Sequence, residues 1–126
     1  PRADRPQAKL AKNNRGREAG IASLEVARAV GVAMGFGTDL IGETQSRQAR
    51  EFAIRAEAET GEQILRSMYV VNPKLCRLEG KVGTLAQGAQ ADIVLTRVNP
   101  LEDIASLADV DELSHVIIAG KVIRQL

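Results

Sequence analysis

The stretch VAMGFGTDL, residues 32–40, runs from apolar residues to a carboxylate at Asp39. Its first part is apolar without alternation, which is typical of a strand buried on both faces. Before it, Glu18–Val30 repeats apolar residues at helical spacing, and Gly31 follows in the position of a C-terminal cap. A helix, a glycine and a buried strand form the second half of a βαβ unit, so this part of the sequence predicts an α/β fold.

The carboxylate at the end of this stretch has two interpretations. Thr38 and Asp39 could form a turn or cap by themselves, since Asp side chains bond to nearby backbone. Alternatively, Asp39 could belong to an active site, because the sites of (β/α)8 barrels lie at the C-terminal ends of the strands. The residues of this stretch alone leave both roles open.

The composition is that of a folded protein of one-domain size. The chain has 126 residues, 44% hydrophobic and 26% charged, which excludes wholesale disorder. The aromatic content of 2% argues against a base-stacking nucleic-acid surface, and the net charge of +1 gives no attraction to polyanions. No apolar run approaches the roughly 20 residues of a membrane span. A single cysteine, Cys76, indicates a reducing compartment, so we expect a soluble, cytoplasmic protein without membrane partners.

The first 17 residues carry six basic side chains and one acidic side chain. This segment could be a nucleic-acid-binding arm or a solvated helix and loop; we expect the second and no nucleic-acid partner. Asn13, Asn14 and Gly16 predict a helix end or turn there.

The middle of the chain predicts three further helices. Ser46 can cap a helix that runs to about Glu59. Thr60–Gln63 has the pattern of a capping box and opens the next helix. Asn72-Pro73 predicts a new N-cap followed by a short helix that stops at Gly80. Cys76, in this helix, is expected to be a packed small residue.

From Gly80 onward, glycines separate short β-like pieces. These are KVGTLAQG at 81–88, ADIVLTRV at 91–98 and HVIIAGKVIRQL at 115–126. The last piece predicts a hairpin with Gly120-Lys121 at its turn, and residues 101–113 between them predict a loop with a helical turn. We therefore expect a boundary near residue 79, with α/β structure before it and mostly β structure after it.

Several of these pieces in order resemble the C-terminal part of metal-dependent amidohydrolases, in the branch of imidazolonepropionase-like and prolidase-like enzymes. They are GFGTD at 35–39, REFAIRAE at 50–57 and the long run at 62–104, which contains G-K-V-G-x-L-x-x-G-x-x-A-D-I-V. The resemblance implies that residues 1–79 are the last helices and final strand of a (β/α)8 TIM barrel. It implies that residues 80–126 belong to a small β-sandwich, the composite domain built from the two chain ends.

The resemblance also implies a function. In this family the aspartate after the eighth strand binds a metal and exchanges protons with the attacking water, and that position matches Asp39. The implied enzyme is a zinc-dependent hydrolase of amide or peptide-like C–N bonds, with dipeptides or N-acyl amino acids as substrates. Gly35 and Gly37 are expected to keep the strand end slim and leave room for the site.

Most of the family's metal ligands have no match in this chain. Its one histidine, His115, lies in the last apolar strand, where we expect a structural role, and Asp92 is expected to position a turn. We therefore expect that this chain alone binds no metal and is inactive, and that it forms a homo-oligomer or associates with the missing barrel portion. The alternative is a non-catalytic, self-associating structural module. The loop residues Glu43, Gln45 and Arg47 could face a substrate or only solvent.

Overall fold

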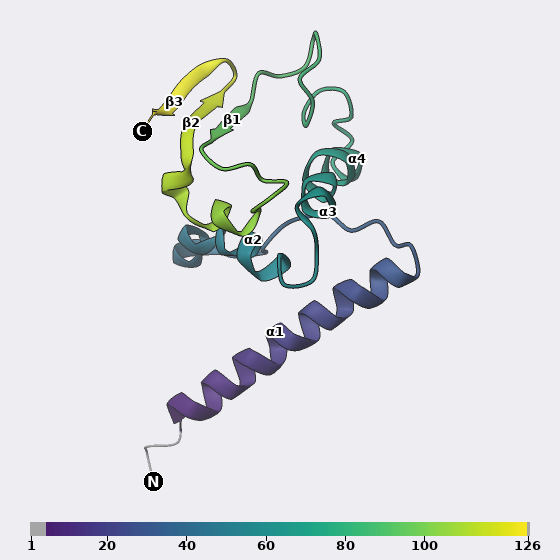
Figure 1. Ribbon diagram of the computed structural model, residues 1–126, viewed down its shortest axis with the longest axis vertical. Helices are drawn as coiled ribbons and strands as arrows, with labels where there is room; N and C mark the ends of the chain where they lie inside the picture. Colours follow the sequence, from purple (N-terminus) through teal and green to yellow (C-terminus); the bar gives the residue numbers. More distant parts are fainter. Residues whose placement is uncertain (1–4, 126) are drawn as a thin grey trace. The chain divides into compact units, whose positions relative to one another are not determined.

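The computed structural model describes the backbone of residues 5–125 and the side chains of residues 15–125. It forms two compact units, which divide in the sequence after Val32. The first unit holds the helix α1, Arg5–Ala29. The remaining helices and all strands belong to the second unit (Figure 1). No helix of the described residues is long and apolar enough to cross a membrane.

Helix α1 is continuous, so the helix end predicted at Asn13–Gly16 is wrong. Asn and Gly each cost at most about 1 kcal/mol relative to Ala in a helix, and the neighbouring Ala, Leu, Lys and Arg residues, which favour helix, can offset this cost. The C-terminal cap is confirmed. Gly31 has a φ of 74°, its N–H donates to Arg28 O at 3.0 Å, and Val32 N–H donates to Ala27 O at 2.9 Å. This is the Schellman pattern.

The second unit is helical first and β-rich later, in the order that the sequence predicts. Its elements are the 3₁₀-helix η1 (Gly42–Arg47), α2 (Arg50–Arg55), α3 (Gly61–Arg66), the π-helical turn η2 (Ser67–Val71), α4 (Asn72–Leu75), β1 (Ile93–Thr96), the 3₁₀-helices η3 (Ala105–Ala108) and η4 (Val110–Glu112), β2 (Leu113–Ile118) and β3 (Lys121–Gln125).

The predicted buried strand is an extended segment that joins no sheet. Residues 32–41 have no regular secondary structure, and the described part of the chain contains a single sheet, β1-β2-β3. The prediction of a strand buried on both faces is therefore wrong, because no strand within residues 5–125 pairs with this segment and none of its residues is buried.

The helix predicted from Ser46 begins later than expected. Ser46 lies inside η1, where its hydroxyl donates to Glu43 O at 3.1 Å instead of capping a helix. Helix α2 begins at Arg50 and ends at Arg55. The capping box before α3 is confirmed: Thr60 Oγ1 accepts from Gln63 N–H at 3.3 Å, and Gln63 Oε1 accepts from Thr60 N–H at 2.9 Å.

The predicted N-cap at Asn72 is wrong, because Asn72 is itself helical, with φ −57° and ψ −47°. The helical path continues from Gly61 through the π-helical turn η2 to Leu75. Pro73 explains the wide turn: it has no N–H for the carbonyl of Tyr69, and its ring would clash with that carbonyl in a regular α-helix. The path ends before Gly80, at Leu75.

The three-stranded sheet is antiparallel. Its hairpin turn lies at Ala119 and Gly120, with φ of 50° and 77°, which is one residue before the predicted Gly120-Lys121. Two positive φ angles are those of a type I′ turn, whose twist suits a hairpin. The predicted β-like piece at 81–88 contains no strand and consists of turns and loop.

A small hydrophobic core joins the two halves of the second unit. Its buried residues are Ile64 from α3, Ile104, and Leu107 from η3, and Phe36 and Phe52 pack against them. This core draws residues from both sides of the boundary predicted near residue 79, which stays a prediction, as does the β-sandwich.

Candidate functional site

Asp39 lies at the end of the extended segment, with an exposed side chain. Its φ is 51°, in the left-handed region, which Asp tolerates better than most residues. Beside it, Thr38 Oγ1 accepts from Leu40 N–H at 3.4 Å. The geometry is therefore that of a turn that presents a carboxylate to solvent.

The backbone just before Asp39 is held by the side chain of Asn72. Phe36 N–H donates to Asn72 Oδ1 at 3.0 Å, and Asn72 Nδ2 donates to Phe36 O at 2.8 Å. One amide side chain thus binds both polar groups of a single residue. Sequence reasoning missed this role, because Asn-Pro is also a common start of a helix and was interpreted as one.

A buried ion pair holds the preceding residue. Arg55 and Glu59 are 3% and 7% exposed, and Arg55 Nε donates to Glu59 Oε2. Arg55 Nη1 also donates to Gly35 O at 2.7 Å. The i, i+4 spacing of the pair was the signal available in the sequence. A charge buried to this degree must be paired to be tolerated, and the pair is tied to the extended segment.

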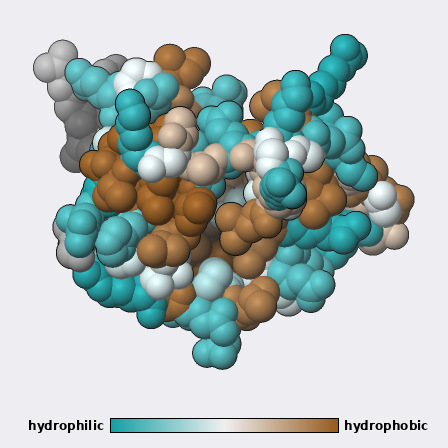
Figure 2. Space-filling model, turned by 90° about the horizontal axis from the view of Figure 1, so that it is seen from above, coloured by the Kyte–Doolittle hydropathy of each residue, from teal (hydrophilic) through white to brown (hydrophobic). Residues whose placement is uncertain are grey.

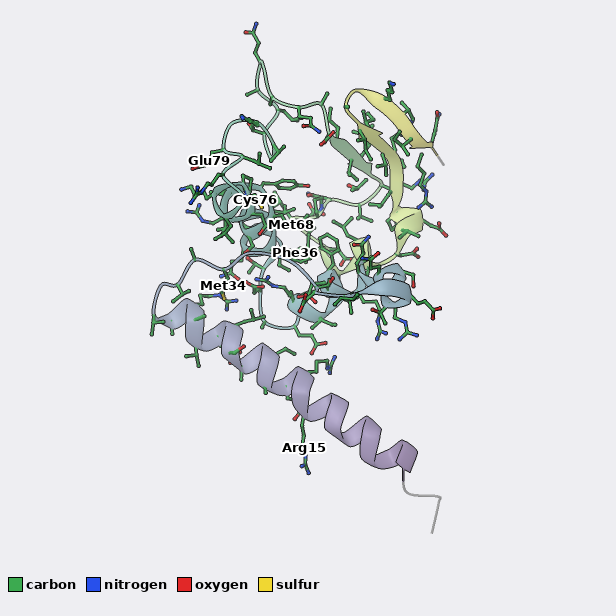
Figure 3. The ribbon with its side chains drawn as sticks, turned by 180° about the vertical axis from the view of Figure 1, so that it is seen from behind. Arg15, Met34, Phe36, Met68, Cys76 and Glu79 are labelled. Atoms are coloured by element: carbon green, nitrogen blue, oxygen red, sulfur yellow. The ribbon has the colours of Figure 1, made fainter. Side chains whose placement is uncertain are left out.

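Aromatic packing places the side chain of Phe36 on the inner side of the segment (Figure 3). The rings of Phe36 and Phe52 have centroids 4.8 Å apart at 36°, and the Arg55 guanidinium carbon lies 5.4 Å from the Phe36 ring centroid. Tilted ring pairs and cations over rings are both favourable. Phe36 is therefore held by its backbone and its ring at once.

The two glycines of the segment differ in what they permit. A Cβ added at Gly35 would lie 2.6 Å from Asn72 Oδ1 and 3.0 Å from Leu75 Cδ1. A Cβ added at Gly37 would have no atom within 4 Å. The absence of a Cβ at Gly35 therefore permits the close approach of Asn72, whereas no contact explains the glycine at position 37.

The described residues do not form a complete metal centre by themselves. Among the residues that the structure describes, no three His, Cys, Asp or Glu side chains form a group that could hold a metal ion. A catalytic zinc has three protein ligands, and Asp39 offers one carboxylate. No reaction step through a metal follows from these residues alone.

The sequence and the fold of this site match one family of proteins. The model of the amidohydrolase family matches residues 4–123, nearly the whole chain. The chain belongs to the amidohydrolase family.

Solved structures of amidohydrolases have the same fold over most of this chain. A crystal structure of an amidohydrolase is 33% identical, with a TM-score of 0.81 over 86% of this chain and 27% of its own. A prolidase complexed with N-methylphosphonate-L-proline is 40% identical, with a TM-score of 0.78 over 85% of this chain and 26% of its own. A Xaa-Pro dipeptidase with bound methionine in its active site is 28% identical, with a TM-score of 0.71 over 82% of this chain and 25% of its own.

This amidohydrolase chain therefore spans about a quarter of the length of the solved structures that it matches. A comparison with curated proteins gives no match. The expected resemblance to amidohydrolases, including prolidase-like enzymes, is confirmed. The role of Asp39 stays a prediction.

The other residues considered from the sequence lie apart from any cluster of ligands. Glu43, Gln45 and Arg47 are exposed in η1, which contains no buried residue. His115 is half-buried in β2, with Nδ1 3.3 Å from Ser114 Oγ. Cys76 is exposed, so its predicted packing is wrong, because the helical path ends at Leu75 and leaves Cys76 in the turn.

Asp92 bonds to the turn of the hairpin. Its Oδ1 accepts from Ala119 N–H at 2.7 Å, and its Oδ2 accepts from Gln90 Nε2 at 2.8 Å. Next to it, Gly120 N–H donates to Ala91 O at 2.9 Å. These bonds connect the chain before β1 to the β2–β3 turn, as expected for a residue that positions a turn.

An open, mostly apolar groove of about 690 Å³ is a feature that the sequence did not reveal. Residues of η2 and α4 line one side, and residues of β1 and β2 line the other. Figure 2 shows large apolar areas at the surface of the molecule. Tyr69, Leu78, Leu85 and Ile118 in this groove are between 39% and 86% exposed. The second unit thus leaves apolar surface uncovered.

Proposed function

We propose that this chain is the C-terminal portion of an enzyme that hydrolyses amide or peptide-like C–N bonds, and that Asp39 is its contribution to the active site. The observation that supports this most is the place of Asp39. Asp39 lies near the C-terminal end of the segment, three residues after Phe36, and Gly35 and Phe36 are held by buried and half-buried groups. The chain that contains it is 40% identical to part of a prolidase. Dipeptides and N-acyl amino acids are the proposed substrates.

Asp39 has the chemistry that this role requires. An exposed carboxylate can accept a proton from an attacking water and pass it on, which is general base catalysis worth about 10²–10⁴-fold in rate. In the complete enzyme, Asp39 would supply one oxygen ligand to a divalent metal, which we propose is zinc. The other ligands must come from outside the residues described, since these offer no cluster.

The uncovered surfaces support association with further protein. The extended segment pairs with no strand among residues 5–125, and the apolar groove is open to solvent. We therefore propose that the chain functions in contact with the rest of a barrel, in the cytoplasm. The same surfaces favour the alternative of a non-catalytic module that associates with itself as a homo-oligomer.

A chimera with the prolidase tests the enzymatic proposal. The part of that protein that this chain matches, 26% of its length, would be replaced by this chain, and hydrolysis of a Xaa-Pro dipeptide and zinc content per chain would be measured. We expect hydrolysis, a loss of at least roughly 100-fold in Asp39→Asn, and less zinc in that variant.

Asp111→Asn is the matched control, because Asp111 has a 78% exposed side chain and takes part only in surface contacts of the β-rich half. We expect its activity to stay within about twofold of the parent chimera. An active chimera in which Asp39→Asn behaves like this control would contradict the proposal. Light scattering on the 126-residue chain tests the alternative, which requires a defined oligomer.

A further inference from the structure

We infer that Asn72 is a positioning residue for the candidate active site: its side-chain amide takes the place of a neighbouring strand and fixes the backbone that leads to Asp39. The inference rests on the proposed role of Asp39. It concerns a residue 33 positions later in the chain, in a helix that does not itself carry a candidate catalytic group.

The hydrogen bonds are those that a strand neighbour would make. In an antiparallel ladder, a residue of a hydrogen-bonded pair donates its N–H to its partner and accepts a bond on its C=O. Phe36 makes both bonds with Asn72, at 3.0 and 2.8 Å. A primary amide can replace the peptide groups of a partner strand because it carries one acceptor oxygen and an N–H donor group.

The helix holds Asn72 in the orientation that these bonds require. The π-helical turn η2 places one more residue per turn just before Asn72, which rotates the following residues by roughly 100° about the helix axis. Pro73, which is buried, fixes the backbone on the other side. Wide turns of this kind often occur at functional sites.

The approach of Asn72 is close and specific. Gly35 leaves only 2.6 Å between the position of a Cβ and Asn72 Oδ1, so any larger residue would push the amide away. Arg55 Nη1 donates a hydrogen bond to Gly35 O at 2.7 Å. Three successive polar groups of the backbone, Gly35 O, Phe36 N–H and Phe36 O, are thus bound by side chains, and Asp39 follows three residues later.

Nuclear magnetic resonance on the isotope-labelled 126-residue chain tests the inference without substrate or metal. Three signals are followed: hydrogen exchange of the Phe36 amide, the backbone and carboxyl shifts of Asp39, and the Ala119 amide, which bonds to Asp92 and reports on the sheet. The variants are Asn72→Leu, which loses both hydrogen bonds, and Asn72→Asp, which keeps the acceptor for Phe36 N–H and loses the donor to Phe36 O.

In Asn72→Leu we expect the Phe36 amide to exchange at least about tenfold faster and the Asp39 signals to shift, with Ala119 unchanged. In Asn72→Asp we expect the Phe36 amide to stay protected within about threefold while the Asp39 signals still shift. Asn99→Leu is the matched control, since Asn99 bonds within its own loop to Leu101 and Glu102, and it should leave Phe36 and Asp39 unchanged.

Unchanged Asp39 signals in Asn72→Leu, with faster exchange at Phe36, would show that Asn72 holds Phe36 alone and would overturn the inference. If Asn72→Leu loses the Ala119 signal because it does not fold, Asn72→Asp decides: unchanged Asp39 signals in that variant would overturn the inference. The result is separate from the proposed function: shifted Asp39 signals together with full hydrolysis by the Asp39→Asn chimera would refute the function and leave the positioning intact.

Discussion

The extended segment before Asp39 and the C-terminal sheet satisfy their backbones in different ways. In the sheet, the backbone of β2 bonds to β1 on one side and to β3 on the other, and a type I′ turn joins β2 to β3. Among residues 5–125, no strand lies beside the segment at 32–41. Its Gly35 and Phe36 carbonyls are bound by the side chains of Arg55 and Asn72, which follow 20 and 36 residues later. In the sheet, the stabilising free energy is spread over many backbone hydrogen bonds, whereas the position of the segment depends on hydrogen bonds from two side chains.

This difference predicts that single substitutions act strongly at the segment and weakly at the sheet. The sharpest test compares two arginines that each pair with a carboxylate. Arg55→Met removes a pair that is almost fully buried, and the bond to Gly35 O goes with it. We expect a loss of about 3–5 kcal/mol in the free energy of unfolding, measured by chemical denaturation.

Arg124→Met is the counterpart in β3, where the Arg124–Asp111 pair is 3.2 Å long and lies at the surface. An exposed pair contributes less than about 1 kcal/mol, so this variant should unfold at nearly the same denaturant concentration as the parent chain. Equal losses in the two variants would mean that the segment depends no more on its side chains than the sheet does.

A second comparison separates two glycines that lie two residues apart. Gly35→Ala places a Cβ 2.6 Å from Asn72 Oδ1, and we expect a loss of about 1–3 kcal/mol in the free energy of unfolding, since the amide must move. Gly37→Ala meets no atom within 4 Å and serves as the control. Thermal unfolding measures the stability of both variants. If Gly37→Ala loses as much stability as Gly35→Ala, the contact between the added Cβ and Asn72 does not explain the loss.

The same division explains what could be predicted from the sequence. The Gly31 cap, the Thr60–Gln63 box and the hairpin were predicted because each is set by residues within a few positions of one another. The expected cap at Asn72 is wrong because Asn72 lies inside the helical path. Its side chain bonds instead to Phe36, 36 residues away, and no local pattern contains that contact. The segment at 32–41 was expected to be a buried strand because apolar runs are typical of such strands, but the pattern does not show whether a partner strand lies beside it.

Asp39 illustrates the limit for the site. The ordered motifs placed it at the end of an extended segment, and the structure has it there, exposed and with a positive φ. The sequence did not predict the side chains that hold the segment before Asp39, which are those of Arg55, Glu59 and Asn72. Charged and amide residues in helices are normally interpreted as solvated residues or as caps. Their burial depends on the packing of α2 and α4 against the segment, which a single sequence does not state.

The smallest expected effect concerns Glu51, in α2 near the Arg55–Glu59 pair. Partial burial raises the pKa of the Glu51 carboxyl above its ordinary value of 4.5; Arg55 opposes this shift and Glu59 adds to it. The folded chain therefore binds this proton more tightly than the unfolded chain. The corresponding stability is fully present below pH 4.5 and is lost as the pH rises through the folded-state pKa.

Glu51→Gln removes this titration, so the variant should gain stability relative to the parent between acid and neutral pH. We expect the melting temperature of the variant to rise by about 2 °C relative to the parent at pH 7, and the two to agree closely at pH 4. Glu79→Gln, in an exposed turn, controls for the loss of one negative charge. A constant difference between Glu51→Gln and the parent at both pH values would mean that partial burial does not raise the pKa of the Glu51 carboxyl in the folded chain.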